Sequence, residues 1–372
     1  MMRGNCKLRK KLSKCTHDLR MDFVKDGILS IISCISCFPE PTVELNGERL
    51  RIVRLLGEGG FSFVYLVTNL TSGGTFALKK IRCLFGDESL ERAMNEVDAY
   101  KLFNHPSIIN AIDFSVIQEK DESKTVYILL PFFRRGNLQD AINANLVNQQ
   151  CFPEEDLLRL FRNLTEAIEA IHYHREPPAS TDRNHSRRRH PINGQDIDFS
   201  ITSNVLAYAH RDIKPGNIMI ADDGVTPVLM DFGSLTHARQ LVQDHADGIR
   251  VQEEAAVHST ISYRAPELFD CPTATQISEK VDIWSLGATL FACLYGSSPF
   301  EGAVDRGGSI ALAVANAQYQ IPEKPNYSET TKDIIRQCLT VEAENRPSAK
   351  RLLKLFAAAI ERLRHCGGDA IA

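Results

Sequence analysis

The stretch His210-Arg211-Asp212-Ile213-Lys214-Pro215-Gly216-Asn217 carries the strongest chemical signal in this sequence. It places a lysine two residues after an aspartate and an asparagine five residues after it. A carboxylate can accept the proton of a hydroxyl group, a lysine can neutralise a transferring phosphoryl group, and an amide oxygen can ligate a hard cation. The pattern predicts a catalytic loop for phosphoryl transfer, with Asp212 as the base and Lys214 as its catalytic partner.

A second acidic motif, Met230-Asp231-Phe232-Gly233, follows this loop. Its carboxylate is predicted to chelate Mg²⁺ at the β- and γ-phosphates of ATP, because oxygen ligands suit a hard cation. The predicted metal ligands are therefore Asn217 and Asp231.

A glycine-rich stretch, Leu56-Gly57-Glu58-Gly59-Gly60-Phe61-Ser62-Phe63-Val64, lies between two predicted strands. Glycine has no side chain, so backbone N–H groups can approach phosphates closely. Gly57 and Gly59 keep this approach, whereas Ser62 replaces the third glycine of the usual spacing and is expected to alter the flexibility of the loop. The predicted ATP contacts here are Leu56, Gly57, Gly59 and Val64.

The next predicted strand contains Phe76-Ala77-Leu78-Lys79. A lysine at this place can reach the α- and β-phosphates of ATP, although a lysine near a strand end is often only a solvated charge. Ala77 and Lys79 are accordingly predicted to bind ATP. Glu96, on a helix predicted over 89–103, is the expected partner of Lys79 and joins the predicted ATP-binding residues, with Glu91 as the alternative.

Hydrophobic patterning predicts an α+β fold in two lobes. Short β-branched and apolar runs predict antiparallel strands at 50–56, 63–68, 75–81, 108–117 and 125–131. Helical periodicity follows at 153–173, 281–295, 330–339 and 348–364. We expect a small antiparallel β lobe with one helix and a larger, mainly helical lobe. The connector after the last strand is expected to bind adenine through its backbone near Phe132 and Phe133, and Phe133 is counted among the ATP-binding residues.

In this order, the motifs from about residue 50 to 360 resemble the eukaryotic protein kinase family. The resemblance implies a bilobal kinase fold and a serine/threonine protein kinase that uses ATP and Mg²⁺ on protein substrates. More narrowly, the glycine-rich stretch, Leu102-Phe103-Asn104-His105-Pro106 and the run from Thr260 to Phe269 resemble the Numb-associated kinases, and among them the lipid-anchored serine/threonine kinase 16 branch. That branch implies an acylated protein of vesicle trafficking on the cytosolic face of endomembranes (Golgi, vacuole or endosome).

The activation segment is expected over 231–267, where Ala265-Pro266-Glu267 closes it and Glu267 is predicted to pair with Arg346. Between His237 and His258 this segment has no Ser, Thr or Tyr. An activating phosphate would ordinarily pair with Arg211. We therefore expect Glu253 or Glu254 to replace the phosphate, and Thr260 to hydrogen-bond near Asp212.

Residues 1–45 form an appended segment that combines basic residues with an apolar run containing Cys34 and Cys37. Myristoylation needs Gly directly after the initiator Met, and this chain begins Met1-Met2-Arg3-Gly4, so that modification is not expected. Cys34 and Cys37 are instead predicted S-palmitoylation sites, which with the basic residues would hold the segment on a membrane surface. The alternatives are a tail that packs on the small lobe, and metal or redox chemistry at the C-x-x-C pair.

Net charge, cysteine content and hydropathy limit the partners and the cellular location that we expect. The formal net charge of −4 gives no reason to expect a nucleic-acid partner, and the oligomeric state is left open. Ten scattered cysteines indicate a reducing, cytoplasmic setting, and the apolar run over 28–38 is too short to cross a bilayer. The polar run over 175–206 predicts a disordered insertion, and 361–372 a C-terminal tail.

Two other classes of protein compete with this interpretation. A non-catalytic pseudokinase or scaffold would have lost Lys79, Asp212 or Asp231, and all three are present. A small-molecule kinase on the same fold is disfavoured by Ala265-Pro266-Glu267, whose segment shapes a peptide-binding ledge.

Overall fold

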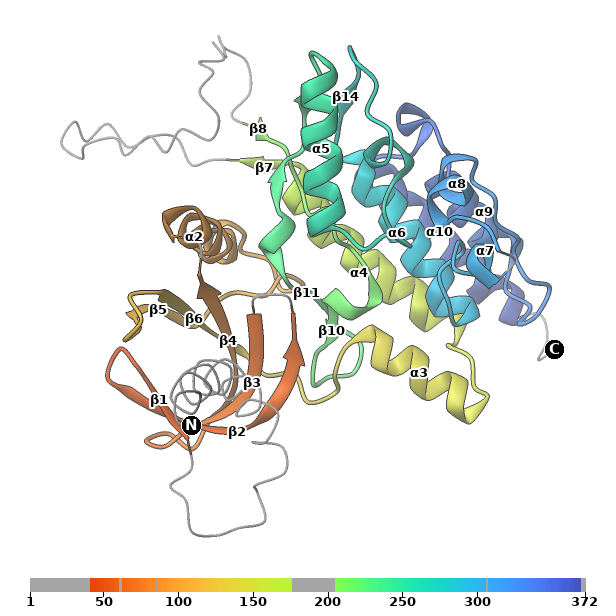
Figure 1. Ribbon diagram of the computed structural model, residues 1–372. Helices are drawn as coiled ribbons and strands as arrows, with labels where there is room; N and C mark the ends of the chain where they lie inside the picture. Colours follow the sequence, from red (N-terminus) through yellow and green to blue (C-terminus); the bar gives the residue numbers. More distant parts are fainter. Residues whose placement is uncertain (1–40, 60–61, 85, 176–204, 306, 369–372) are drawn as a thin grey trace, which may run out of the picture. The chain divides into compact units, whose positions relative to one another are not determined.

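The computed structural model describes residues 41–59, 62–84, 86–175, 205–305 and 307–368 (Figure 1). The predicted palmitoylation sites Cys34 and Cys37 and nearly all of the predicted insertion lie outside the described residues. The chain divides into two compact units, a smaller one of residues 41–97 and 111–132 and a larger one of residues 98–110 and 133–368. Each unit is described by itself.

The smaller unit is built on an antiparallel sheet of six strands in the order β1-β2-β3-β4-β6-β5. The strands are β1 (Thr42–Leu45), β2 (Glu48–Glu58), β3 (Ser62–Asn69), β4 (Thr75–Cys83), β5 (Asp113–Gln118) and β6 (Lys124–Pro131). Buried residues alternate along β3 at Tyr65 and Val67, as a strand with one covered face requires. These two pack with Leu50, Leu78 and Leu129 in the core of the sheet. Helix α2 (Gly86–Leu102) follows β4.

The larger unit is mainly helical. Its helices are α3 (Leu138–Asn148), α4 (Glu154–His172), α5 (His245–His258), α6 (Lys280–Tyr295), α7 (Gly302–Asp305), α8 (Ile310–Ala315), α9 (Glu329–Cys338) and α10 (Ala349–Gly368). Short strands pair as β7 (His174–Arg175) with β8 (Val205–Leu206), β9 (Tyr208–Ala209) with β12 (Thr236–His237), β10 (Ile218–Ile220) with β11 (Pro227–Leu229), and β13 (Gln240–Leu241) with β14 (Gln276–Ile277). Single 3₁₀ turns are η2 (Pro215–Asn217), η3 (Phe232–Ser234), η4 (Pro266–Leu268) and η5 (Ala343–Asn345).

Helix α6 forms the centre of this unit, because every residue from 281 to 294 is buried. A helix that is buried on all sides must be apolar nearly all round, and its few polar groups need partners. Ser285 accordingly donates to the carbonyl oxygens of Tyr263 and Val281, and Trp284 stacks on Phe300 with ring centroids 5.5 Å apart.

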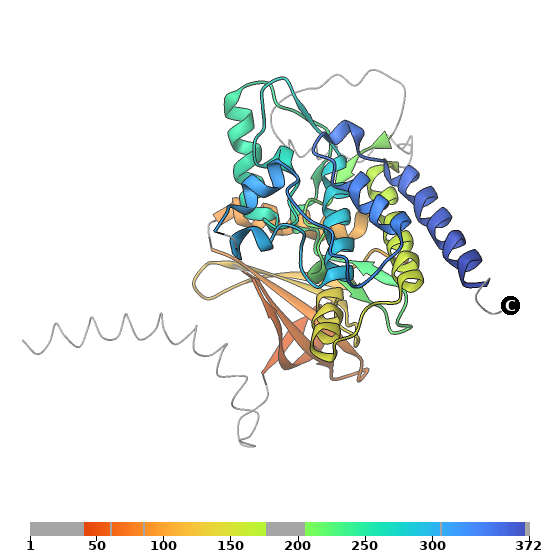
Figure 2. The same ribbon diagram turned by 90° about the vertical axis from the view of Figure 1, so that its right-hand side faces the viewer.

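Helices α4 and α10 pack along each other at one side of α6 (Figure 2). Leu157, Leu164 and Ile168 recur at helical spacing on the buried face of α4, and Phe161 meets Phe356 of α10 at 6.4 Å between ring centroids. These helices close the core on which the loops of the site rest.

The α+β fold with a small antiparallel sheet and a mainly helical part was predicted from the sequence and is confirmed. One predicted strand, 108–117, was wrong in its first half. Ile108 forms an isolated bridge with Leu229 in the larger unit, where the Ile109 N–H donates to the Leu229 carbonyl oxygen, and the strand begins only at Asp113. Helices α3, α5, α7 and α8 were not predicted. Among the described residues, no helix is long and apolar enough to span a membrane.

Candidate active site

The carboxylate of Asp212 is held on both oxygens by polar groups of the larger unit. Oδ2 lies 2.8 Å from Lys214 Nζ and accepts from Asn217 Nδ2 at 2.9 Å. Oδ1 accepts from the backbone N–H of Thr260 at 2.9 Å and from its hydroxyl at 2.8 Å. The contact predicted between Thr260 and Asp212 is therefore present. Lys214 also donates to the Thr260 hydroxyl at 2.7 Å, so Asp212, Lys214 and Thr260 form a closed network.

The loop that carries Asp212 is anchored on Asp282, near the start of α6. Asp282 is fully buried, and its two oxygens accept from the backbone N–H groups of His210 and Arg211, each at 2.8 Å. His172 Nε2 lies 3.0 Å from Oδ2. Burial by itself raises the pKa of Asp282, but the hydrogen bond from His172, the charges of His172 and His210, and the Arg211 N–H outweigh it, so this pKa lies below its usual value.

Two residues of the predicted catalytic and metal-binding loops have a strained backbone. Arg211 and Asp231 both have φ of 66°, in the left-handed region that costs non-glycine residues about 1–3 kcal/mol. Such a conformation persists only where the surroundings over-determine it. The strained residues stand directly before Asp212 and at a predicted metal ligand, which supports a functional interpretation of both loops.

The donor atoms of Asn217 and Asp231 suit a hard divalent cation. Asn217 Nδ2 gives its two N–H bonds to the carboxylate and the carbonyl oxygen of Asp212, each at 2.9 Å, so only Oδ1 remains to ligate a cation. The described residues contain no group of three or more His, Cys, Asp or Glu placed to hold a metal. Mg²⁺ is commonly held by one or two side chains together with substrate phosphates, and a carboxylate with an amide oxygen fits that mode.

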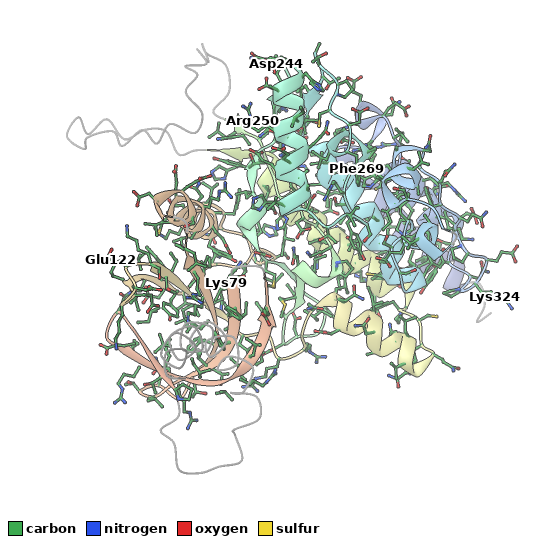
Figure 3. The ribbon with its side chains drawn as sticks, in the orientation of Figure 1. Lys79, Glu122, Asp244, Arg250, Phe269 and Lys324 are labelled. Carbon is green, nitrogen blue, oxygen red and sulfur yellow. The ribbon has the colours of Figure 1, made fainter. Side chains whose placement is uncertain are left out.

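In the smaller unit, Lys79 on β4 (Figure 3) forms an ion pair with Glu96 of α2 at 2.6 Å. Both side chains are about nine-tenths buried, at 11% and 7% exposure. Glu91 is exposed, so the structure decides between the two predicted partners in favour of Glu96. A buried pair of this kind holds the lysine Nζ at a fixed point beside the sheet.

The other predicted ATP-binding residues of the smaller unit lie on strands around Lys79. In the register of the sheet, Val64 on β3 pairs with Gly57 on β2 and with Lys79 on β4. Ala77 lies two residues before Lys79 on β4, so the two side chains share one face of the sheet. Leu56 and Gly57 lie near the end of β2, where the register shifts, and Gly59 donates its N–H to the carbonyl oxygen of Ser62 at 2.7 Å. Gly60 and Phe61 lie outside the described residues. Phe133 belongs to the larger unit.

The activation segment contains a helix that the sequence did not predict. Asp244 caps the N-terminus of α5 (Figure 3) by accepting from the Asp247 N–H at 2.9 Å. Gly248 faces the carbonyl oxygen of Cys271 so closely that a Cβ would stand 2.6 Å from it, which lets the helix pack tightly on the loop after η4. The helix ends at His258, two residues before Thr260.

The predicted pair of Glu267 and Arg346 closes the segment, with two bonds of 2.7 Å between guanidinium and carboxylate. The prediction that Glu253 or Glu254 pairs with Arg211 was wrong. Its Nη2 donates to Gln240 Oε1 at 2.9 Å, and Glu254 acts on it only through its charge.

Comparison with known proteins agrees with this geometry. The model of the protein kinase domain matches residues 50–176 and 205–355. The chain belongs to the protein kinase family.

Three relatives of this kinase match it over most of its length. They are the serine/threonine-protein kinase ppk13 of Schizosaccharomyces pombe (36% identity, covering 85% of this chain and 92% of the relative), the serine/threonine-protein kinase ENV7 of Saccharomyces cerevisiae (35%, 87% and 96%) and serine/threonine-protein kinase 16 of Homo sapiens (35%, 85% and 92%). The kinase is therefore a serine/threonine protein kinase, and the family uses ATP with a divalent metal ion.

Three groups at the site of this kinase escaped sequence reasoning. They are His172, Gln240 and the cap Asp244. Only the cap had a usable signal, because an Asp three residues before another Asp at the start of an Ala-containing run predicts a helix N-terminus. His172 and Gln240 acquire their partners across long chain separations.

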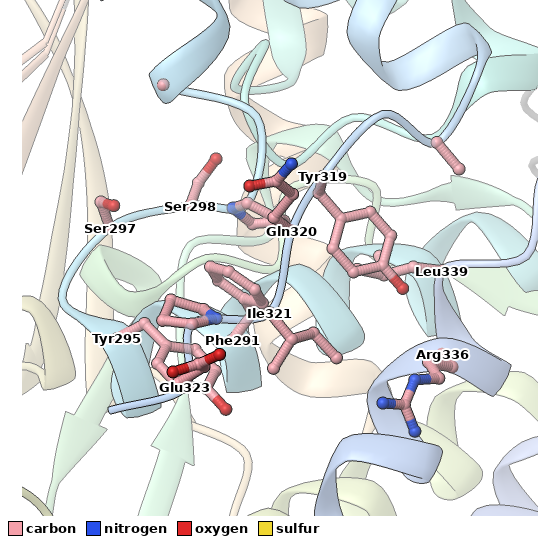
Figure 4. Close-up of a pocket in the computed structure, with 14 residues that line it drawn as sticks. Phe291, Tyr295, Ser297, Ser298, Tyr319, Gln320, Ile321, Glu323, Arg336 and Leu339 are labelled. Atoms are coloured by element: carbon pink, nitrogen blue, oxygen red, sulfur yellow. The ribbon is translucent and has the colours of Figure 1, made fainter. Parts of the chain in front are cut away.

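The larger unit of the kinase also has an open cavity of about 1000 Å³ at the C-terminal end of α6 (Figure 4). The rings of Phe291, Tyr295 and Tyr319 line it, with Arg336 of α9 at its edge. None of the predicted site residues lines this cavity. It is therefore not the predicted active site.

Proposed function

We propose that this chain transfers the γ-phosphate of Mg-ATP to serine and threonine hydroxyls of protein substrates, with Asp212 as the base. The supporting observation is the arrangement of the Asp212 carboxylate, which Thr260 holds on Oδ1 and which Lys214 and Asn217 hold on Oδ2. A carboxylate fixed in this way can accept a hydroxyl proton in one defined orientation. Lys214, whose Nζ lies 2.8 Å from Asp212, would neutralise charge on the transferring phosphoryl group.

The nucleotide would be held mainly by the residues predicted from the sequence. Lys79, fixed by Glu96, would contact the α- and β-phosphates, and the backbone at Gly57 and Gly59 would cover them. Leu56, Val64 and Ala77 would give apolar contact to adenine, and the backbone at Phe133 would supply its hydrogen bonds. Mg²⁺ held by Asn217 Oδ1 and Asp231 would neutralise charge on the β- and γ-phosphates.

The direct test is a transfer assay with γ-labelled ATP, Mg²⁺ and a general protein substrate such as casein. The parent is compared with the variants Asp212→Asn and Lys79→Met, and with Arg336→Ala, an exposed residue of α9 outside the predicted site, as a control. We expect transfer to Ser and Thr by the parent and the control alone. Transfer by Asp212→Asn at the parent's rate would contradict the role of Asp212, and no transfer by the parent would favour the pseudokinase alternative.

We further propose that the kinase acts at the cytosolic face of endomembranes, held there by palmitoylation of Cys34 and Cys37. The support comes from the sequence: two cysteines flanked by isoleucines, next to a basic run. Two acyl chains with nearby basic residues anchor a protein stably, at about 0.8 kcal/mol per buried methylene.

Membrane fractionation of a Cys34→Ser, Cys37→Ser double variant tests the acylation. A Cys6→Ser, Cys15→Ser variant changes two cysteines of the same segment and is the matched control. We expect only the first variant to move to the soluble fraction. Unchanged membrane retention of that variant would contradict palmitoylation at these sites.

A further inference from the structure

The guanidinium group of Arg211 is buried in the larger unit with few partners. The residue is 6% exposed, and its Nε has no hydrogen-bond acceptor among the residues that the structure describes. The charges of Glu254 and Asp282 act on it, but neither carboxylate forms an ion pair with it. Burying a cation without an opposite charge in contact costs free energy. The position of the guanidinium group therefore depends strongly on the hydrogen-bond partner that it does have.

Gln240 is the residue that touches it. Its Oε1 accepts from Arg211 Nη2 at 2.9 Å, and its Nε2 donates to the Thr236 hydroxyl at 3.2 Å. The position of Gln240 is fixed in turn, because it lies on β13 opposite Ile277 of β14. One amide side chain therefore links the loop that carries Asp212 to the beginning of the activation segment.

An activating phosphate, where a kinase carries one, would pair with this same arginine. Residues 238–257 contain no Ser, Thr or Tyr, so this part of the segment cannot be phosphorylated on a hydroxyl. The neutral amide of Gln240 supplies an acceptor to the same guanidinium group that a phosphate would contact. We propose that Gln240 is a positioning residue, which takes the place of the activating phosphate and holds Arg211, and through it Asp212, in the catalytic arrangement.

The effect on catalysis follows from the backbone. Arg211 has a strained φ of 66° and stands directly before Asp212, and its backbone N–H is bonded to Asp282. Its conformation is thus determined at the main chain by Asp282 and at the tip of the side chain by Gln240. Without the second constraint the guanidinium group would be free to leave its site, and the carboxylate of Asp212 would spend less time in place.

Because this inference rests on the proposed function, the test combines kinetics with a measurement that needs no activity. Gln240→Ala is compared with the parent, with Gln240→Glu, and with Gln243→Ala, a nearby glutamine with an exposed side chain. For each protein, kcat and the KM for ATP are measured well below the unfolding temperature of the least stable variant. Amide hydrogen exchange of the peptide covering 208–217 is followed on the same samples.

We expect Gln240→Ala to lower kcat on the order of 10-fold, the effect of losing one hydrogen bond to a charged group, with the KM for ATP unchanged. Gln240→Glu should keep most of the parent's kcat, because a carboxylate accepts from the guanidinium group at least as well as an amide. Exchange at 208–217 should be faster in Gln240→Ala only.

Parent-like kcat and exchange in Gln240→Ala would overturn the inference, and so would a loss of kcat in Gln240→Glu as large as in Gln240→Ala. If the parent itself shows no transfer, the proposed function fails. The exchange data then decide the positioning role alone: faster exchange in Gln240→Ala supports it, and unchanged exchange refutes it.

Discussion

Two buried guanidinium groups of the larger unit, Arg346 and Arg211, are held in opposite ways. All the side-chain nitrogens of Arg346 have partners: both oxygens of Glu267 and the carbonyl oxygens of Thr340, Lys280 and Val341. Arg211 is bonded to one neutral amide, and its Nε has no acceptor. The interactions of Arg346 stabilise the fold, whereas Arg211, next to Asp212, is held by a single side-chain hydrogen bond. A buried charge is therefore weak evidence of a structural role until its partners are counted.

The largest effect is expected at the fully paired arginine. Arg346→Ala would leave the Glu267 carboxylate and several carbonyl groups without a donor, and should lower the free energy of unfolding by about 3–5 kcal/mol. Urea denaturation of the full chain measures this. Arg336→Ala removes an arginine with 48% side-chain exposure and two ion pairs, and should cost only about 0–1 kcal/mol. Equal losses of unfolding free energy in Arg346→Ala and Arg336→Ala would contradict a special stabilising role of the buried Arg346.

A smaller loss is expected at the anchor of the catalytic loop. Asp282→Asn retains the shape but loses one of the two charged acceptors for His210 and Arg211, at a cost of about 1–3 kcal/mol near neutral pH.

The pH dependence gives this anchor a distinct signature. The pKa of Asp282 is lowered from 3.8 in the folded protein, so its ionised form contributes stability above pH 3.8. That contribution is lost as pH falls through the folded-state pKa. Unfolding measured from pH 7 down into this range should therefore show a shallower acid loss in Asp282→Asn than in the parent. If the free energy of unfolding falls equally with pH in both proteins, the ionisation of Asp282 does not contribute to the loss of stability in acid.

Removing the sparsely paired arginine should matter little for stability. Arg211→Ala loses a single hydrogen bond while also relieving the burial of a charge, so the free energy of unfolding should fall by about 1 kcal/mol. The same denaturation series measures it beside Arg346→Ala. A loss as large as that of Arg346→Ala would show that the environment of Arg211 is as tightly determined as that of Arg346.

The smallest effect is expected from removing phosphate. Because Gln240 already bonds to Arg211 and residues 238–257 have no hydroxyl-bearing side chain, phosphatase treatment should leave kcat unchanged. The γ-labelled ATP assay, with mass spectrometry to verify dephosphorylation, measures this. Loss of nearly all activity on treatment, restored by incubation with ATP, would show that a phosphate elsewhere controls the enzyme.

The sequence predicted the site best where the functional residues lie only a few positions apart in the chain. Asp212, Lys214 and Asn217 stand within six consecutive positions, so their clustering around one carboxylate follows from the loop itself. The partner of Lys79 was narrowed to two glutamates on one predicted helix, and burial chose Glu96. Patterning found most of the sheet and the helices α2, α4, α6, α9 and α10, because buried faces repeat at periods of two and 3.6 residues.

The sequence by itself determined the family, the fold class and the residues proposed for phosphoryl transfer, because these depend on local motifs and periodicity. Tertiary structure alone decided the partner of Arg211. Gln240 lies 29 positions further along the chain, and only the pairing of β13 with β14 brings its amide to the guanidinium group. Asp244 marks the start of helix α5 in the sequence, but no local pattern shows that Gly248 of this helix packs against the carbonyl group of Cys271. Long-range packing selects one partner among several acceptable ones, and that choice is not encoded in any single stretch of the chain.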